Sequence, residues 1–223
     1  MRRVTATAAK VFIFEAVIGA ILFGCAGRLD LPWFWALIAV HATALLLGMV
    51  RMDPELERER RRPASGPSGK EYLHRLGGTF LIIAHLAIAG LDAGRYHWSP
   101  PPPLAARIVA LVVYALALGF SMWAIAENRF FSSVVRLQSD RGHHVIDTGP
   151  YRYVRHPGYA SAVIMVLCSG LALGSWLSLL PSALAIVALV VRTRFEERVL
   201  RDGLPGYDEY THRVPYRLLP GVW

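Results

Sequence analysis

Long apolar stretches separated by short polar connections dominate the chain. A membrane helix needs roughly 20 apolar residues to cross a bilayer core of about 30 Å. Four stretches approach this length, from about Val11 to Ala26, Leu31 to Val50, Leu76 to Leu91 and Leu104 to Ala126, the third being extended at either end. The pattern therefore predicts four membrane-spanning helices within residues 1–127.

A fifth apolar stretch runs from Pro157 to Val191 and is too long for one span. Gly174 and Ser175 interrupt it and Pro181 follows, which predicts two helices in a tight hairpin, or a shorter re-entrant one. The expected fold is an all-α, polytopic integral membrane bundle of about six transmembrane helices. Residues 1–127 would form the N-terminal spans, and residues 128–223 a catalytic region with the hairpin and a cytoplasmic C-terminal cofactor site.

Composition and charge support a membrane protein and predict its orientation. The chain is 54% hydrophobic and 18% charged, with a net charge of +8. This composition excludes a disordered chain or a small disulfide scaffold, and it disfavours an ordinary soluble domain. The charged and then Pro/Gly/Ser-rich segment 51–70 is expected to be a solvated cytoplasmic loop, because basic loops face inward.

Six spans then place both termini and residues 128–156 in the cytoplasm. Only Arg28, Arg95 and Arg107 would lie on the opposite side. The preference for arginine over lysine favours a GC-rich bacterial genome, and hence the bacterial cytoplasmic (inner) membrane. The positive charge is then explained by loops facing an anionic leaflet, with no nucleic acid as partner.

Two groups of residues have plain structural interpretations. Cys25 and Cys168 lie in apolar runs, and the chain has no CxxC or HExxH motif, so no metal site is expected. Glu15, His41 and His85 fall inside predicted spans, where polar groups are costly. Hydrogen bonding between helices is favoured for them over a catalytic role.

Residues 128–223 mix polar and apolar positions in a way that residues 1–127 do not. The segment from Gln138 to Tyr159 contains turns and several histidines and tyrosines. Pro157 can begin a helix, which would place His156 at the membrane–water boundary. The free N–H groups of such a helix start suit a carboxylate. The alternative is an interfacial loop that only anchors the chain.

Two further segments follow the hairpin. Arg192 and Glu196 are four residues apart and share one helical face, as a catalytic pair or as a surface ion pair. Residues 207–223 mix aromatic residues with arginines, which is typical of an interfacial amphipathic helix followed by a tail. This segment would serve either as an anchor or in ligand binding.

These pieces together resemble a known family. RHPGY at Arg155–Tyr159, preceded by GPYRYV and followed by RTRFEE and EYTHRVPYRLLPG, is similar to the isoprenylcysteine carboxyl methyltransferase family. That family belongs to a wider membrane group that includes phospholipid N-methyltransferases. The resemblance covers about the last hundred residues. Ser161 departs from the pattern, since family members often have glycine at this position.

The resemblance implies S-adenosylmethionine as cofactor at the cytoplasmic mouth of the last helices. Arg192 would face the carboxylate of the acceptor and would form the catalytic pair with Glu196. The implied cofactor contacts are Gln138, His143, His144, Val145, Ile146, Tyr151, His156, Pro157, Gly158, Tyr159 and Glu196.

The implied acceptor is a lipophilic or lipidated molecule that arrives from the membrane lipid. Methyl transfer to a carboxylate needs proximity, alignment and a dry site, but no general base. An amine acceptor would need one, and His143 or His144 is the candidate. Prenylated proteins are not expected in a bacterium, so the acceptor stays open. The alternatives are a phospholipid, a small lipophilic amine or thiol, or a non-enzymatic membrane transport or assembly protein of the same fold.

Overall fold

Every regular element in the described part of the chain is a helix. The computed structural model describes residues 2–61, 63, 66 and 69–223. The long helices are α1 (Arg2–Ala26), α2 (Pro32–Arg51), α4 (Gly69–Ala89), α5 (Leu104–Glu127), α6 (Pro157–Leu173) and α7 (Leu179–Gly203). The short elements are α3 (Pro54–Arg61), the π-helix η1 (Gly90–Tyr96), the 3₁₀ turns η2 (Ser139–Arg141) and η3 (Gly149–Arg152), and α8 (Tyr207–Arg213). The all-α prediction is confirmed.

Among the described residues, four helices are long and apolar enough to cross a membrane: Thr5–Ala26, Pro32–Met49, Glu71–Tyr96 and Leu104–Glu127. They correspond to the four spans predicted from the apolar stretches. The third is longer than its apolar core because η1 continues α4 to Tyr96. Asp92 in η1 is fully buried, and it accepts hydrogen bonds from Ser99 and Ser175 at 2.6 Å each. The hydrogen bond to Ser175 holds the end of the third span against the connection between α6 and α7.

The predicted hairpin forms from α6 and α7. Gly174 ends α6 in the left-handed conformation, with φ of 96°, which favours glycine. Pro181 lies in the first turn of α7, where its missing N–H breaks no helical bond. α6 has 17 residues, and α7 becomes charged from Arg192 onward. The hairpin is confirmed, and its crossing of the membrane as two further spans stays a prediction.

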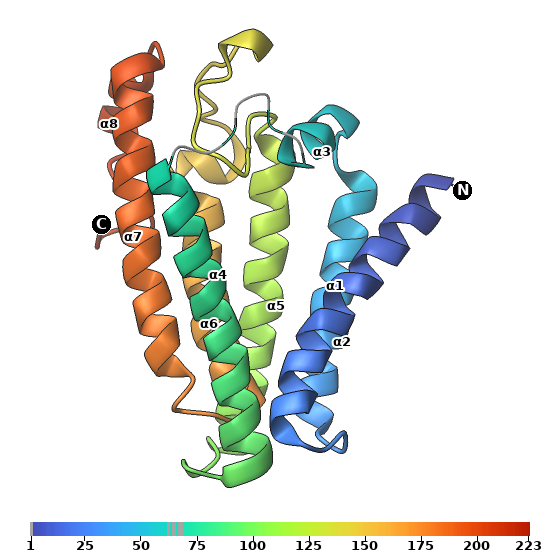
Figure 1. Ribbon diagram of the computed structural model, residues 1–223. Coiled ribbons are helices and arrows are strands. Elements are labelled where there is room, and N and C mark those ends of the chain that lie inside the picture. The colour runs from blue at the N-terminus through green and yellow to red at the C-terminus, as the bar shows by residue number, and fades with distance from the viewer. Residues whose placement is uncertain (1, 62, 64–65, 67–68) are drawn as a thin grey trace.

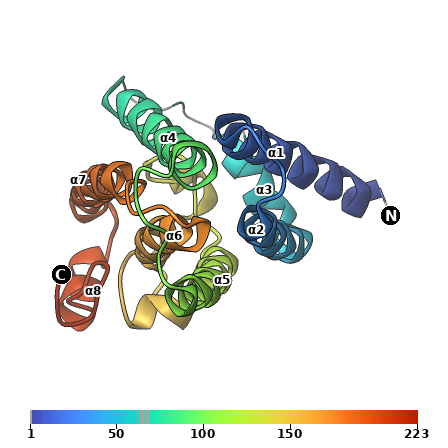
Figure 2. The ribbon, with the colours of Figure 1, turned by 90° about the horizontal axis from the view of Figure 1, so that it is seen from below.

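α6 lies at the centre of the bundle. Figure 2 shows it surrounded by α4, α5 and α7, with α1 and α2 paired on one side. The buried core includes Leu22, Phe34, Leu86, Leu118 and Leu173. Large apolar side chains such as Phe80, Leu116 and Leu184 are exposed on the helices outside this core. Exposed apolar side chains on long helices are expected where the surrounding solvent is lipid.

The two ends of the bundle differ. Figure 1 shows the start of α1, α3, the segment between α5 and α6, and α8 toward the upper end. The connections after α1, after η1 and after α6 lie at the lower end. Arg28, Arg95 and Arg107 belong to these lower connections and the helix turns beside them. The structure therefore groups the segments as the charge pattern predicts.

The segment predicted as a solvated loop is partly helical. α3 occupies Pro54–Arg61, and its Leu56 is only 1% exposed. Glu59 pairs with Arg136 at 2.9 Å, so α3 packs against the segment that follows α5. The loop prediction is wrong here because the helix is short and charged residues fill most of its eight positions, so they outweighed the one apolar residue. Residues 62, 64, 65, 67 and 68 of this segment lie outside the described residues.

The polar residues of the spans connect neighbouring helices. Nδ1 of His41 on α2 lies 2.8 Å from Oε1 of Glu15 on α1. His85 on α4 bonds the Ser178 carbonyl at 3.0 Å and the hydroxyls of Ser169 and Ser182 at 2.9 Å each. The expected interhelical hydrogen bonding is confirmed for His85, which joins α4 to α6 and α7.

His85→Ala should lower the free energy of unfolding by about 2 kcal/mol, because it removes the buried hydrogen bonds that join α4 to α6 and α7 and creates a cavity. Thermal unfolding of the detergent-solubilised protein measures this. His212→Ala, at a residue whose side chain is 78% exposed, is the control. Equal midpoints for the two variants would contradict the assigned role of His85.

Candidate functional site

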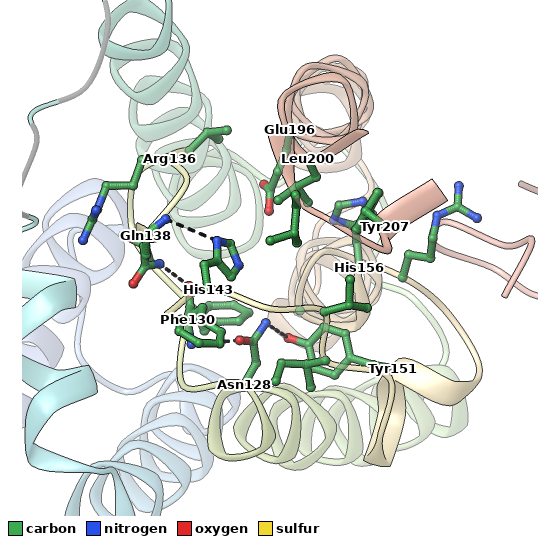
Figure 3. Close-up of a pocket in the computed structure, with 18 of the residues that line it drawn as sticks. Asn128, Phe130, Arg136, Gln138, His143, Tyr151, His156, Glu196, Leu200 and Tyr207 are labelled. Atoms are coloured by element: carbon green, nitrogen blue, oxygen red, sulfur yellow. Dashed lines mark hydrogen bonds between the residues drawn. The ribbon is translucent and has the colours of Figure 1, made fainter. Parts of the chain in front are cut away.

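A cavity of about 250 Å³ lies where the segment after α5, the start of α6, the charged end of α7 and α8 meet (Figure 3). A single water needs only about 10–15 Å³ by a comparable measure, so the cavity can hold a small molecule. Every site residue predicted from the sequence lines it: Gln138, His143, His144, Val145, Ile146, Tyr151, His156, Pro157, Gly158, Tyr159, Arg192 and Glu196. The structure thus brings the whole predicted set together.

Arg192 and Glu196 are joined through Tyr159. The hydroxyl of Tyr159 donates to Glu196 Oε2 at 2.5 Å, and Arg192 Nε donates to the same hydroxyl at 2.8 Å. No direct ion pair within 4 Å joins Arg192 to Glu196 in the described part of the chain, so the surface-pair interpretation is not supported. Figure 3 shows Glu196 pointing from α7 into the cavity.

The guanidinium of Arg192 is held on one edge. Its Nη2 donates to the Ser133 carbonyl at 3.2 Å and lies 3.6 Å from Glu71 Oε1. Its Nη1 makes no hydrogen bond to any residue that the structure describes. A fixed guanidinium with one terminal nitrogen available can bind an anion in a defined orientation.

A second, smaller cavity adjoins the first. It measures about 160 Å³ and lies between α4 and α7, lined by Glu71, His74, Val135, Val191, Arg192 and Phe195. Arg192 and Val135 line both cavities. Arg192 therefore lies at the boundary between a cavity of mixed polar and apolar character and a largely apolar one.

Glu197 lies beside the site, and the sequence pattern did not single it out. Its carboxylate accepts from Arg155 Nε at 2.5 Å and from Arg217 Nε, and it lies 3.5 Å from His156 Nε2. Glu197 is only 3% exposed and does not line the cavity. Two adjacent glutamates point about 100° apart on a helix, so one can be structural while the other faces the site. Their sequence alone does not tell which is which.

One wall of the cavity is built from the segment that follows α5. The Gln138 side chain donates to the Phe130 carbonyl at 2.6 Å, and the Gln138 backbone N–H donates to His143 Nδ1 at 3.3 Å. Burial, together with the nearby His144, Arg136 and Arg141, lowers the pKa of His143 to about 4. His143 is therefore neutral near pH 7 and a weak base.

Two buried polar atoms in the wall have no hydrogen-bond partner in the described chain, although one of them, His156 Nε2, lies 3.5 Å from Glu197 Oε1. His156 Nε2 and the Tyr207 hydroxyl make no hydrogen bond to any described residue. Buried polar groups without a partner are uncommon in proteins and call for an explanation such as a bound ligand. Both residues line the cavity, so they fit a ligand that carries its own hydrogen-bonding groups.

Several lining residues were not predicted. They are Arg60 from α3, Asn128, Phe130, Phe131, Ser132, Ser133, Val134, Val135, Arg136, Arg155, Leu200, Leu204, Tyr207 and Tyr210. The aromatic and arginine content of residues 207–223 was a usable signal for the last two, since it left ligand binding open. Arg60 had none, because it reaches the site only through a contact between distant parts of the chain.

Glu197→Ala should lower the free energy of unfolding by about 3–5 kcal/mol, since it leaves the buried Arg155 without its counter-charge. The thermal unfolding midpoint in detergent measures the loss. The exposed Glu209, changed to Ala, is the control. The assignment of Glu197 as a structural centre fails if both variants unfold at the same temperature.

The depressed pKa of His143 predicts a pH dependence of stability. The unfolded chain, with a histidine pKa near 6.5, binds the proton before the folded one does. The contribution of neutral His143 to the free energy of unfolding is therefore complete above about pH 6.5 and is lost as the pH falls toward about 4. His143→Gln should flatten the fall of the unfolding midpoint over this window. Parallel profiles for variant and wild type would contradict the prediction.

Comparison with known proteins shows that the chain is similar to methyltransferases. Residues 105–204 match the model of the phospholipid methyltransferase family. The match includes nearly all of α5, which the motif resemblance did not cover, and ends before α8.

Curated relatives point the same way. Two proteins of Oryza sativa, from the indica and japonica subspecies, are each named probable protein-S-isoprenylcysteine O-methyltransferase. Each is 28% identical over 149 residues, which cover 65% of this chain and 74% of the relative. The protein-S-isoprenylcysteine O-methyltransferase of Schizosaccharomyces pombe is 26% identical over 129 residues, 51% of this chain and 52% of its own.

The motifs, the helical membrane fold and these relatives agree. They support a methyltransferase enzyme, and the family implies a methyl donor and a lipophilic or lipidated acceptor. Together they support assigning the chain to the isoprenylcysteine carboxyl methyltransferase family, within the wider group of membrane phospholipid methyltransferases.

Proposed function

We propose that the protein is an integral membrane methyltransferase that uses S-adenosylmethionine and methylates the carboxylate of a lipophilic, isoprenylcysteine-like acceptor. The observation that carries this proposal is the position of Arg192. It lines a cavity of mixed polar and apolar character on one side and a largely apolar cavity on the other. A methyl donor and an apolar acceptor could meet at this boundary with their reacting groups beside one guanidinium.

The larger cavity suits the methyl donor. S-adenosylmethionine carries an adenine, a ribose diol and an amino-acid end, all of which need hydrogen-bond partners or aromatic faces. Glu196 can pair with an ammonium or with ribose hydroxyls, and the Tyr207 hydroxyl makes no hydrogen bond in the described chain. When bound, the cofactor would supply a methyl group on a sulfonium, so that an oxygen–carbon bond forms to the acceptor as the carbon–sulfur bond breaks and S-adenosylhomocysteine leaves.

Arg192 would hold the acceptor carboxylate. Tyr159, Ser133 and Glu71 fix the orientation of its guanidinium, and Nη1 would bind one carboxylate oxygen and leave the other aligned for the transfer. The second cavity would take the apolar part of the acceptor, between α4 and α7. An ionised carboxylate reacts without losing a proton, so the site needs no base.

An amine acceptor has weaker support. A base for it should have a pKa near the working pH, whereas the pKa of His143 is about 4. Nδ1 of His144 bonds the Gly142 carbonyl at 3.0 Å, and the residue is exposed. A carboxylate acceptor is therefore favoured over a phospholipid head group or a small amine.

The same proposal includes the orientation of the protein in the membrane. α6 and α7 would cross the membrane as fifth and sixth spans, with the cavity and the N-terminus on the cytoplasmic side. Basic residues concentrate at the end of the bundle that carries the cavity, as the positive-inside rule requires. The protein would lie in the cytoplasmic membrane of a bacterium.

Isothermal calorimetry with S-adenosylhomocysteine tests the cofactor site. The detergent-purified wild type should bind, and Glu196→Ala should weaken binding about tenfold or more, because it removes a charged partner of the ligand. Arg192→Lys should keep the affinity for S-adenosylhomocysteine and lose methyl transfer, since lysine cannot reproduce the fixed guanidinium.

Glu209→Ala serves as the control for charge, because Glu209 is exposed on α8. Wild-type affinity in Glu196→Ala would overturn the site assignment. A folded wild type that does not bind S-adenosylhomocysteine would favour a transport or assembly protein that kept the fold.

A further inference from the structure

Arg60 reaches the larger cavity from α3, in the part of the chain that neither the motifs nor the family match covers. Its Nη1 donates to the Phe131 carbonyl at 3.4 Å, and its guanidinium lies 5.0 Å from the centre of the Phe131 ring. Burial lowers the pKa of the Arg60 guanidinium, which remains charged at any physiological pH. The cavity wall thus contains a partly buried cation held by neutral groups.

The other arginines of the cavity wall already have carboxylate partners. Arg136 pairs with Glu59 at 2.9 Å and with Asp140 at 2.8 Å, and Figure 3 shows it turned away from the cavity. Arg155 pairs with Glu197, and Arg192 lies near Glu71. Arg60 alone among them has no carboxylate within 4 Å in the part of the chain that the structure describes.

Arg60 is held in place by the segment after α5. The Ser133 hydroxyl donates to the Arg60 carbonyl at 3.1 Å. The Phe131 ring beneath the guanidinium packs on Gly158, where an added Cβ would come within 2.8 Å of the ring. Phe131 therefore lies between Arg60 and the start of α6, so the guanidinium belongs to the same wall as RHPGY.

The start of α6 offers little to an anion. Pro157 has no N–H, and the N–H groups of Tyr159 and Ala160 both donate to the His156 carbonyl, at 3.1 and 3.0 Å. In this first turn, only the N–H of Gly158 remains for a ligand. The expectation that this helix start binds a carboxylate is thus weaker than the sequence indicated. A buried carboxylate needs more compensation, and a guanidinium supplies it best.

The position of Arg60 also indicates which anionic group it would bind. Arg60 lines the larger cavity but not the apolar one, whereas Arg192 lines both. The acceptor carboxylate would lie at the boundary beside Arg192. The only anionic group of S-adenosylmethionine is the carboxylate of its amino-acid end. We propose, on the basis of the proposed function, that Arg60 binds this carboxylate, so that the N-terminal part of the chain completes the cofactor site.

Calorimetry with two ligands tests this inference. S-adenosylhomocysteine carries the carboxylate, and its decarboxylated analogue lacks only that group. Arg60→Gln should weaken binding of S-adenosylhomocysteine about tenfold to a hundredfold and leave the affinity for the analogue nearly unchanged. Arg58→Gln removes the same charge from an exposed position of α3 and should change neither affinity.

The other outcomes contradict either the assignment of Arg60 or the proposed function. Unchanged binding of S-adenosylhomocysteine by Arg60→Gln would overturn the assignment, and so would an equal loss for both ligands, which would indicate a general effect on the cavity. An unchanged thermal midpoint of the ligand-free variant excludes misfolding as the cause. Failure of the wild type to bind S-adenosylhomocysteine would instead refute the proposed function, which separates the two claims.

Discussion

The buried carboxylate of Glu197 is the interaction on which the site depends. It joins α7 to Arg155, just before α6, and to Arg217 in the C-terminal tail. Arg155 also donates to the Val214 carbonyl at 2.5 Å, and the N–H groups of Arg155 and His156 bond the carbonyls of residues 216 and 217. Because Arg155 and Glu197 are both buried, these two charges are costly to separate. The cluster fixes the register of α7 against the start of α6, and this register directs the neighbouring Glu196 into the cavity.

The rest of the cavity follows from this register. With α7 in place, Arg192 and Glu196 meet on the two sides of the Tyr159 hydroxyl. The N-terminal helices then complete the wall, since Glu71 on α4 accepts the Val135 N–H at 2.8 Å and lies beside Arg192. α3 adds Arg60 and holds the segment after α5 through Glu59. A site whose motifs lie in the last hundred residues is thus built by the whole chain.

The sequence predicts those features that local rules determine. The apolar stretches, Gly174 and the helix-starting prolines marked helix ends because hydrophobic length and backbone sterics act locally. The predicted cofactor residues came from motifs whose members fold into one wall. The sequence did not predict Glu197 as the structural centre, α3 as a packed helix, the π-helical end of α4, or Arg60 as a lining residue. Each depends on contacts between distant segments, and neither periodicity nor composition records such contacts.

The central claim is that this site methylates a carboxylate of a lipophilic acceptor. Its most direct test is transfer of radiolabelled methyl from S-adenosylmethionine to N-acetyl-S-farnesylcysteine by the purified protein, followed by treatment of the product with mild alkali. A methyl ester releases its label as methanol, whereas a methylated amine or thioether keeps it. We predict alkali-labile label in the acceptor. Label that resists alkali, or no transfer by a protein that binds S-adenosylhomocysteine, would contradict the claim.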